Sequence, residues 1–319
     1  MTRRALIVLI TGLVLWPVPW NRAGAQEPDG LAVAAALEQT LTSVIEKAGK
    51  SVVSIARMRR DRRPQPLDPF NPFRPDQNDL ASPEFVPNQY GSGVVIAGGA
   101  GGNERFVLTG YHVVLDSAST GPVGQQTESR LFVRFADRRG CEAQILAADP
   151  RSDLAVLQLD FEQLGLKPAE VPALPLPEST ELRKGQLVVA LGNPYAVARD
   201  GSASASWGMI SNLSRRPAAG LQSPVDEDQP TETIHQFGTL LQVDTRLNLG
   251  TSGGALLNLH GELIGLTTAL AALEGYEKSA GYAIPMDAGT RRIIDSLTQG
   301  YEVEYGFLGV RPENALAGG

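Results

Sequence analysis

The sequence predicts an all-β fold of antiparallel sheet, arranged as barrels or as a sandwich. Two observations predict it: roughly twelve short β-branched runs are separated by turns, and no helical segments alternate with them. A third observation is a content of 42% hydrophobic and 20% charged residues in a chain of 319, which is typical of a globular protein with a sizeable core. The composition therefore excludes a disordered tail, a coiled coil and a disulfide-bonded miniprotein.

The expected elements begin and end with helices. Residues 31–47 form an amphipathic helix, because apolar residues recur there at three- and four-residue spacings and Gly49 follows. A second amphipathic helix is expected over 287–297. The expected strands lie between them, at 51–55, 93–96, 106–109, 131–135, 143–146, 154–159, 187–191, 207–210, 240–243, 255–258, 262–267 and 282–284.

Three stretches interrupt the series of strands. Residues 57–90 are rich in Pro, Asp, Asn and Arg and carry three Phe residues, which indicates a long loop with apolar anchors. Residues 166–177 contain four prolines and are expected to connect two halves of the fold. Residues 214–238 form an acidic loop.

Residues 1–25 are expected to be a secretory signal peptide and not part of the fold. Arg3 and Arg4 precede an apolar stretch, and residues 23–25 form an Ala-Gly-Ala cleavage site. An uncleaved membrane anchor is the alternative, although the run falls short of the roughly 20 residues that span a bilayer and contains Pro17. The chain is therefore expected to be exported, and to be periplasmic or extracellular after cleavage.

Charge and rare residues exclude several other classes. The formal net charge of −7 disfavours nucleic acid as a partner, because an acidic surface repels phosphate. Cys141 is the only cysteine and is expected in an exposed turn, so no intramolecular disulfide can form. The three histidines, His112, His235 and His260, match no zinc-binding motif. We expect no metal and no organic cofactor.

A serine between glycines, in the Gly-Thr-Ser-Gly-Gly segment over 250–254, is the sharpest local sign of chemistry. Such a turn points backbone N–H groups at one spot. The segment fits the Gly-x-Ser-x-Gly elbow of α/β-hydrolases, the Gly-x-Ser-Gly-Gly loop of trypsin-fold proteases, and a glycine-rich turn without chemistry.

The histidines separate these alternatives. An α/β-hydrolase requires the order Ser, Asp, His, but the only histidine after Ser252 is His260, which follows too closely to leave room for an acid and its strands. His235 lies in a polar loop and is expected to be solvated. His112 follows an expected strand and remains as the candidate base.

The candidate acid follows His112, which gives the order His, Asp, Ser of trypsin-fold proteases. Asp149 precedes a proline and is expected to form a turn. Asp153 abuts an apolar run, where a carboxylate needs a partner such as an imidazole N–H. The candidate catalytic residues are therefore His112, Asp153 and Ser252.

With these residues in place, the chain resembles the HtrA (DegP-like) family of trypsin-fold serine proteases. The resemblance covers residues 51–310, through the segments at 51–55, 91–96, 153–157, 191–194, 242–244, 250–254, 261–265 and 281–285. It implies two six-stranded antiparallel β-barrels, about 51–165 and about 180–285, within a protease domain at 26–300. The sequence departs from the family pattern at Gly110 and Thr251, where Asn is usual, and at Arg246 and Leu249.

The resemblance also implies the remaining site residues. The oxyanion hole would be formed by Gly250 and Ser252 with help from Thr251. The pocket for the substrate side chain before the scissile bond (P1) would be lined by Arg246, Leu247, Leu266, Thr267 and Thr268. None of these is acidic, so an uncharged P1 residue is expected.

The implied function is that of a serine endopeptidase that cleaves unfolded or misfolded polypeptides in the cell envelope, for protein quality control. The alternative is a catalytically idle chaperone or binding module that retains the fold. A homotrimer or higher oligomer is expected, assembled through Phe70, Phe73 and Phe85; the alternative is that these side chains fold back on their own barrel. Residues 301–319 are expected to be a linker and a vestigial or truncated PDZ start, because the segment 305–310 resembles the opening of such a domain.

Overall fold

The structure, a computed structural model, describes part of the chain: residues 30–59, 89–99, 101–114, 129–177, 181–194, 201–216, 233–248, 250–268 and 281–306. The chain divides into two units, Met1–Glu38 and Gln39–Gly319, and all strands among the described residues lie in the second unit. The expected signal peptide, the three loop phenylalanines and residues 307–319 lie outside the described residues.

Helix α1 (Gly30–Ala48) matches the helix expected over 31–47. Its last turns belong to the second unit, where Val44 and Ala48 are buried in a core shared with both barrels. Residues four apart lie on one helix face, which is why these two are buried together. The short helix η1 (Gly49–Ser51) leads directly into the first strand.

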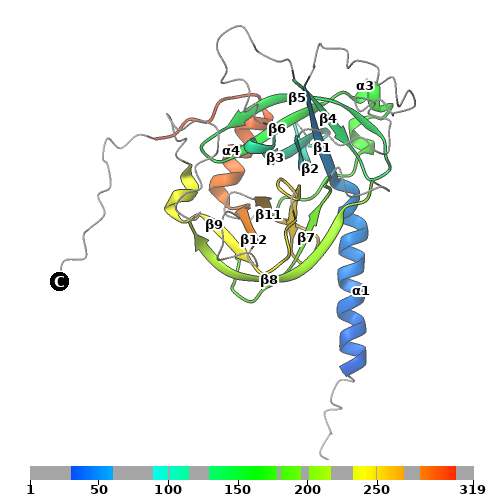
Figure 1. Ribbon diagram of the computed structural model, residues 1–319, viewed down its shortest axis with the longest axis vertical. Helices are drawn as coiled ribbons and strands as arrows, with labels where there is room; N and C mark the ends of the chain where they lie inside the picture. The colour runs from blue at the N-terminus through cyan, green and yellow to red at the C-terminus, as the bar shows by residue number, and fades with distance from the viewer. Residues whose placement is uncertain are drawn as a thin grey trace, which may run out of the picture. The chain divides into compact units, whose positions relative to one another are not determined.

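The first barrel closes from six antiparallel strands in the order β1-β2-β3-β6-β5-β4 (Figure 1). Successive side chains of a strand point to opposite faces. In β1, Val53 and Ile55 therefore face the barrel interior, whereas Val52 faces the core shared with the second barrel. The strands are β1 (Val52–Arg59), β2 (Gln89–Gly98), β3 (Glu104–Gly110), β4 (Ser129–Arg134), β5 (Gly140–Asp149) and β6 (Leu154–Leu159).

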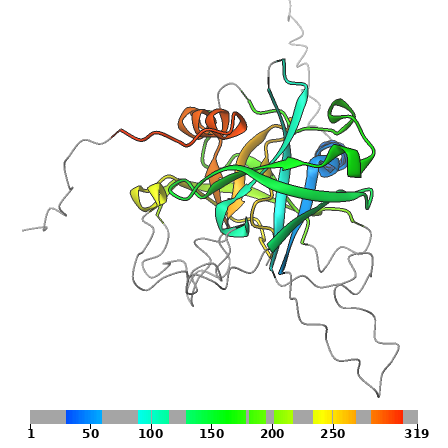
Figure 2. The same ribbon diagram turned by 90° about the horizontal axis from the view of Figure 1, so that it is seen from above.

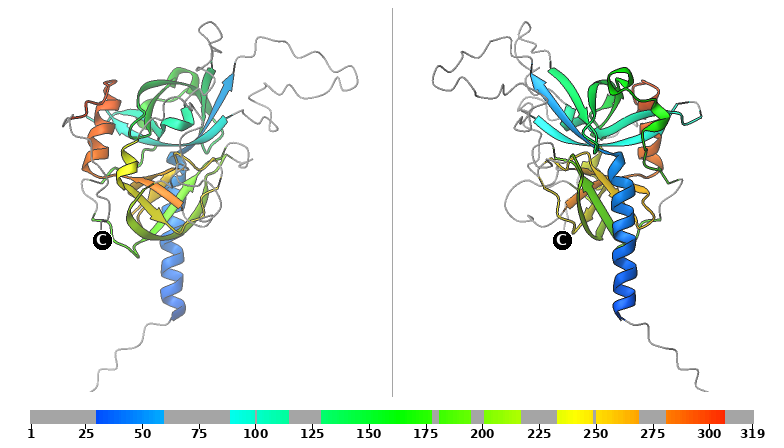
Figure 3. Two further views of the ribbon diagram at one scale, coloured as in Figure 1. Left: turned by 60° about the vertical axis from the view of Figure 1, so that its left-hand side comes forward. Right: turned by 90° about the vertical axis from the view of Figure 1, so that its right-hand side faces the viewer.

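The second barrel closes in the order β10-β11-β12-β9-β8-β7 and lies beside the first (Figure 3). Residues of β7 also alternate between two cores. Val188 and Ala190 face the interior of the second barrel, and Val189 and Leu191 face the core shared by the two barrels. The strands are β7 (Leu187–Gly192), β8 (Ser204–Arg215), β9 (Leu240–Val243), β10 (Ala255–Leu257), β11 (Leu263–Thr268) and β12 (Gly281–Pro285).

Helix α4 (Ala288–Thr298) follows β12 of the second barrel but packs on β5 and β6 of the first (Figure 2). Its first turn is capped by the carboxylate of Asp287, which accepts a hydrogen bond from the Thr290 amide at 2.8 Å. Ile293, Ile294 and Leu297 are buried on one face. Truncation of Leu297 to Ala would cost about 2–5 kcal/mol of stability.

The expected fold class is confirmed: the described strands form two closed six-stranded barrels, with one helix before them and one after. One stretch expected as loop is partly strand, since Arg57 at the end of β1 pairs with Gln89 at the start of β2. The proline-rich connector contains the short helix η2 (Pro168–Glu170). In the described part of the chain, every helix is too short or too polar to span a bilayer.

The expectation of an exposed Cys141 is wrong. The turn ends before it, and Cys141 lies in β5 opposite Val133, fully buried inside the first barrel. Burial raises the pKa of its thiol to about 11. Cys141 is therefore a small core side chain that stays protonated.

Candidate active site

The structure brings together the three residues that the sequence singled out. His112 lies in the one-turn helix α2 (Tyr111–Val114), directly after β3. Asp153 lies in the turn between β5 and β6, and the pairing of Gly110 with Leu154 places the two chain segments side by side. Ser252 comes from the second barrel, in the loop before β10. The site therefore forms only where the two barrels meet.

A continuous chain of hydrogen bonds joins the three side chains. His112 Nδ1 lies 2.9 and 2.8 Å from the two carboxylate oxygens of Asp153, and His112 Nε2 lies 2.8 Å from Ser252 Oγ. An ionised carboxylate only accepts hydrogen bonds, so Nδ1 carries the proton in the neutral imidazole and Nε2 accepts from the serine hydroxyl. This arrangement is suited to removing the proton of Ser252.

The electrostatics of His112 favour this role. Burial alone lowers the pKa of His112, but the charge of Asp153 and the hydrogen bond to it raise the pKa above its ordinary value of 6.5. A raised pKa makes the imidazole a stronger base for the proton of Ser252. The backbone amide of His112 also donates to Asp153 Oδ1 at 3.0 Å, which fixes the two groups relative to each other.

The backbone of Asp153 is held in an unusual conformation. Its φ angle is +54°, in the left-handed region, and its side chain is buried. The Tyr111 amide donates to its carbonyl at 3.0 Å, and the Thr268 hydroxyl lies 3.5 Å from its carboxylate. The fold thus fixes the acid from both barrels.

Two glycines give the nucleophile turn its shape. Gly250 and Gly253 both have positive φ angles, of 86° and 83°. A Cβ at position 253 would lie only 2.1 Å from the carbonyl oxygen of Ser92, so only glycine fits there.

Ser92, in β2, holds the nucleophile turn from the first barrel. Its amide donates to the carbonyl of Ser252 at 2.8 Å, and its hydroxyl donates to the carbonyl of Gly250 at 2.7 Å. The same hydroxyl accepts from the Asn193 amide at 2.9 Å, while Thr109 donates to the Ser92 carbonyl at 2.7 Å. Sequence reasoning missed this residue, although a polar side chain between two glycines in an apolar strand was a usable signal.

Thr251 is oriented differently from the expectation. Both its amide and its hydroxyl donate to the carbonyl of Asn248, at 3.1 and 2.7 Å, so its donors are engaged within the turn. Its carbonyl accepts from the Thr267 hydroxyl at 2.6 Å and from the Gly254 amide at 2.9 Å. Thr251 therefore braces the turn, and its help in an oxyanion hole is not supported.

The residues expected to line a substrate pocket have three different environments. Arg246 is exposed, and Leu247 is half-buried beside Gly281, where a Cβ would lie 2.9 Å from it. Leu266 packs in the core that the two barrels share, which corrects its expected pocket position. Thr267 and Thr268 are buried in β11 and direct their hydroxyls to Thr251 and Asp153, as described above.

The expectation that His235 is solvated is wrong. His235 lies in the short helix η3 (Ile234–Phe237) and is 1% exposed. Its Nε2 lies 2.9 Å from the Ser152 carbonyl and its Nδ1 lies 2.7 Å from the Thr239 hydroxyl. Burial lowers its pKa below the ordinary value of 6.5. The polar residues around it in sequence predicted exposure, but its contact with Ser152 of the first barrel buries the ring.

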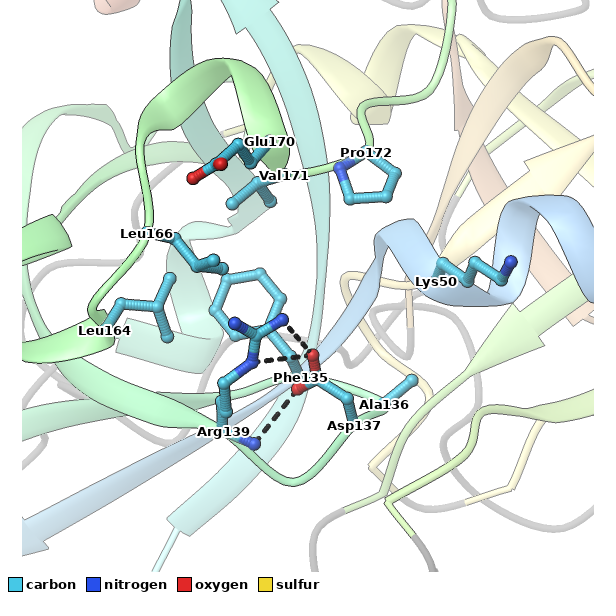
Figure 4. Close-up of a pocket in the computed structure, with 10 residues that line it drawn as sticks. All are labelled: Lys50, Phe135, Ala136, Asp137, Arg139, Leu164, Leu166, Glu170, Val171 and Pro172. Atoms are coloured by element: carbon cyan, nitrogen blue, oxygen red, sulfur yellow. Dashed lines mark hydrogen bonds and ion pairs between the residues drawn. The ribbon is translucent and has the colours of Figure 1, made fainter.

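A separate pocket of about 400 Å³ lies on the first barrel, and none of the predicted site residues lines it (Figure 4). Phe135, Leu164 and Val171 supply apolar lining, and the ion pair of Arg139 with Asp137 lies beside them. Among the residues that the structure describes, no three His, Cys, Asp or Glu side chains gather closely enough to hold a metal ion.

The chain is similar to known proteins over most of its length. Residues 91–266 match the family model of the trypsin-like peptidase domain. The chain is 29% identical over 312 residues to the periplasmic serine endoprotease DegP of Salmonella typhimurium, across 95% of this chain and 60% of that protein. It is 32% identical over 221 residues to the periplasmic pH-dependent serine endoprotease DegQ of Escherichia coli, across 69% of this chain and 40% of that protein.

A solved structure is similar over most of the chain. The crystal structure of Deg5 matches with a TM-score of 0.54 at 25% identity, over 83% of this chain and 98% of that one. The chain spans only 60% and 40% of the lengths of the two curated relatives named above.

Proposed function

Because the chain belongs to the trypsin-like peptidase family, as an HtrA/DegP-like member, we propose that it is a serine endopeptidase acting through Ser252, His112 and Asp153. The observation that carries the proposal is the chain of hydrogen bonds from Ser252 Oγ through the imidazole to the Asp153 carboxylate. An assembly of nucleophile, base and orienting acid at these distances is the arrangement needed for acyl transfer.

In the first step, Ser252 Oγ bonds to the carbonyl carbon of the substrate while its proton passes to His112 Nε2. The Asp153 carboxylate holds the imidazole in the required tautomer and stabilises the imidazolium that forms. His112 then gives the proton to the leaving amine as the peptide C–N bond breaks. Water, activated by the same imidazole, hydrolyses the acyl-enzyme and restores the serine.

The amides of Gly250 and Ser252 are the proposed donors to the oxyanion. The carbonyl of Thr251 is held by Thr267 and Gly254, and a planar trans peptide points its N–H away from its C=O. The Ser252 amide is thereby aimed away from the Thr267 side of the turn. One oxyanion donor is worth about 3 kcal/mol of transition-state stabilisation in known enzymes.

The proposed substrates are unfolded or misfolded polypeptides of the cell envelope. The relatives are named periplasmic endoproteases, which supports a protease role in the envelope. The exposed Arg246 and the half-buried Leu247 favour an uncharged, aliphatic P1 side chain, because neither supplies an acid to pair with Lys or Arg. We also propose that the chain assembles into a homotrimer or a larger homo-oligomer.

Covalent labelling tests the proposed chemistry directly. An organophosphonate probe should label the protein on Ser252, and Ser252→Ala should lose both the labelling and the cleavage of casein while keeping its fold. The matched control is Ser296→Ala, because Ser296 lies on α4 and its hydroxyl donates only to the Arg292 carbonyl. Unchanged casein cleavage by Ser252→Ala would refute the assignment.

A further inference from the structure

The acid of the site sits at the end of a tight turn that Asp149 organises. Asp149 ends β5, and its carboxylate accepts hydrogen bonds from the amides of Ser152 at 3.1 Å and Arg151 at 3.4 Å. Asp149 is buried and pairs across the strands with Leu154, so the residues between them are confined. The direction in which Asp153 leaves this turn depends on how Asp149 is held.

Tyr305 holds Asp149 from outside the first barrel. It lies in the segment that follows α4, and its hydroxyl hydrogen-bonds to Asp149 Oδ2. The Arg151 guanidinium lies over its ring, 5.1 Å from the centroid. Burial and the neighbouring Asp149 carboxylate raise the pKa of Tyr305, so the phenol stays protonated and donates to the carboxylate.

The same turn is also held by η3, which precedes β9 of the second barrel. The Ile234 amide donates to the Arg151 carbonyl at 2.8 Å, and His235 contacts the Ser152 carbonyl. Helix η3 and the last described segment lie on the same side of the barrels in Figures 1 and 2. The turn is thus held by two segments that are distant from it in sequence.

This fixation matters because Asp153 is held with a φ of +54°, which is unfavourable for a residue with a Cβ. Such a conformation persists only where the surrounding contacts enforce it. A small rotation of the turn would move both carboxylate oxygens, which lie 2.8 and 2.9 Å from His112 Nδ1. Loss of that geometry would leave the imidazole less well oriented toward Ser252.

We propose that Tyr305 is a positioning residue for the reaction, which holds Asp149 and through it the turn that presents Asp153 to His112. The inference rests on the proposed peptidase function. It gives the segment 301–306 a role that reaches the reacting groups through Asp149.

The test compares Tyr305→Phe, which removes only the hydroxyl, with Tyr301→Phe as the matched control on the same segment. Tyr301 is 64% exposed, so its hydroxyl is not expected to matter. For Tyr305→Phe we expect kcat to fall about tenfold with KM nearly unchanged, which corresponds to about 1.4 kcal/mol of transition-state stabilisation. The acid limb of kcat/KM should move to lower pH, because a weaker contact with Asp153 lowers the pKa of His112.

A double-mutant cycle distinguishes the proposed route from a general loss of structure. Tyr305→Phe should have little further effect in an Asp149→Asn background, because the carboxylate through which it acts is gone. An unchanged kcat in Tyr305→Phe, or an equal loss of kcat in both backgrounds, would overturn the proposal. If Tyr305→Phe does not fold, Asp149→Asn alone decides: the same kcat loss and pH shift support the proposal, and wild-type values overturn it.

A spectroscopic readout separates this inference from the peptidase proposal itself. The proton on His112 Nδ1 gives a far-downfield NMR signal when it is hydrogen-bonded to a carboxylate, and its position does not depend on turnover. We expect the signal to shift in Tyr305→Phe and to stay in place in Tyr301→Phe. A signal unchanged by Tyr305→Phe would count against the positioning role, even if Ser252→Ala shows that the serine is the nucleophile.

Discussion

Replacement of Ser92 by Ala tests whether the first barrel holds the nucleophile turn. Ser92 is fully buried, and its hydroxyl is shared between the Gly250 carbonyl and the Asn193 amide. Alanine would leave both backbone groups without this partner, and each unsatisfied buried group costs about 1–3 kcal/mol. For two such groups we therefore expect a loss of roughly 2–6 kcal/mol in the free energy of unfolding.

The same change should slow catalysis, because the Gly250 carbonyl fixes the orientation of the turn that precedes Ser252. Complete removal of an oxyanion donor lowers kcat by about 10²–10³, so a misaligned turn should lower it by roughly ten- to a hundredfold. Urea unfolding gives the stability, and steady-state cleavage of a peptide gives kcat.

Ser54 offers a matched control, since it lies directly opposite Ser92 on β1 and is also buried. Its hydroxyl makes one hydrogen bond of 3.4 Å, to the Arg134 carbonyl, which is near the limit of such contacts. Ser54→Ala should therefore cost less than about 1 kcal/mol and leave kcat intact. Equal stability and equal kcat in the two variants would refute the reasoning.

Four other predictions follow from the same structure and sequence. Burial lowers the pKa of His235, so the unfolded chain binds a proton there more readily than the folded protein does. The wild type should therefore lose stability as the pH falls below about 6.5. Urea unfolding at several pH values should show that His235→Gln lacks this loss. The buried Cys141 thiol, with its pKa of about 11, should react with Ellman's reagent only after denaturation, and rapid reaction of the folded protein would contradict its burial. Mass spectrometry of a digested, denatured protein should show that cleavage occurs mainly after aliphatic residues. Cleavage mainly after Lys or Arg would refute the pocket proposal, and cleavage mainly after Asp or Glu would assign Arg246 to the pocket. Deletion of residues 60–88 should lower the oligomer mass in sedimentation, since burying one Phe contributes about 2 kcal/mol to assembly, and an unchanged mass would exclude this loop.

The identity of the triad candidates could be predicted because it depends on chain order and residue chemistry. Ser252 was marked by its glycines, and the order His, Asp, Ser left His112 and Asp153 as its partners. The strands could be predicted from the β-branched apolar runs, because a strand that is buried on both faces has apolar residues at successive positions. In β1 and β7 that run supplies residues to two different cores.

The burial of single polar residues could not be predicted in this way. His235 and Cys141 both have polar neighbours in sequence, but each is surrounded by segments from elsewhere in the chain. Local patterns report the average character of a segment, whereas burial of one side chain depends on which distant segment packs against it.

The sequence by itself determined the fold class and which residues carry the candidate chemistry, because spacing and residue type are local properties. Only the tertiary structure decided how those residues are held. Ser92, Tyr305 and His235 act across 158, 156 and 83 positions of the chain, on Gly250, Asp149 and Ser152. Contacts over such separations exist only after the barrels have closed, since barrel closure and packing bring those atoms within hydrogen-bonding distance.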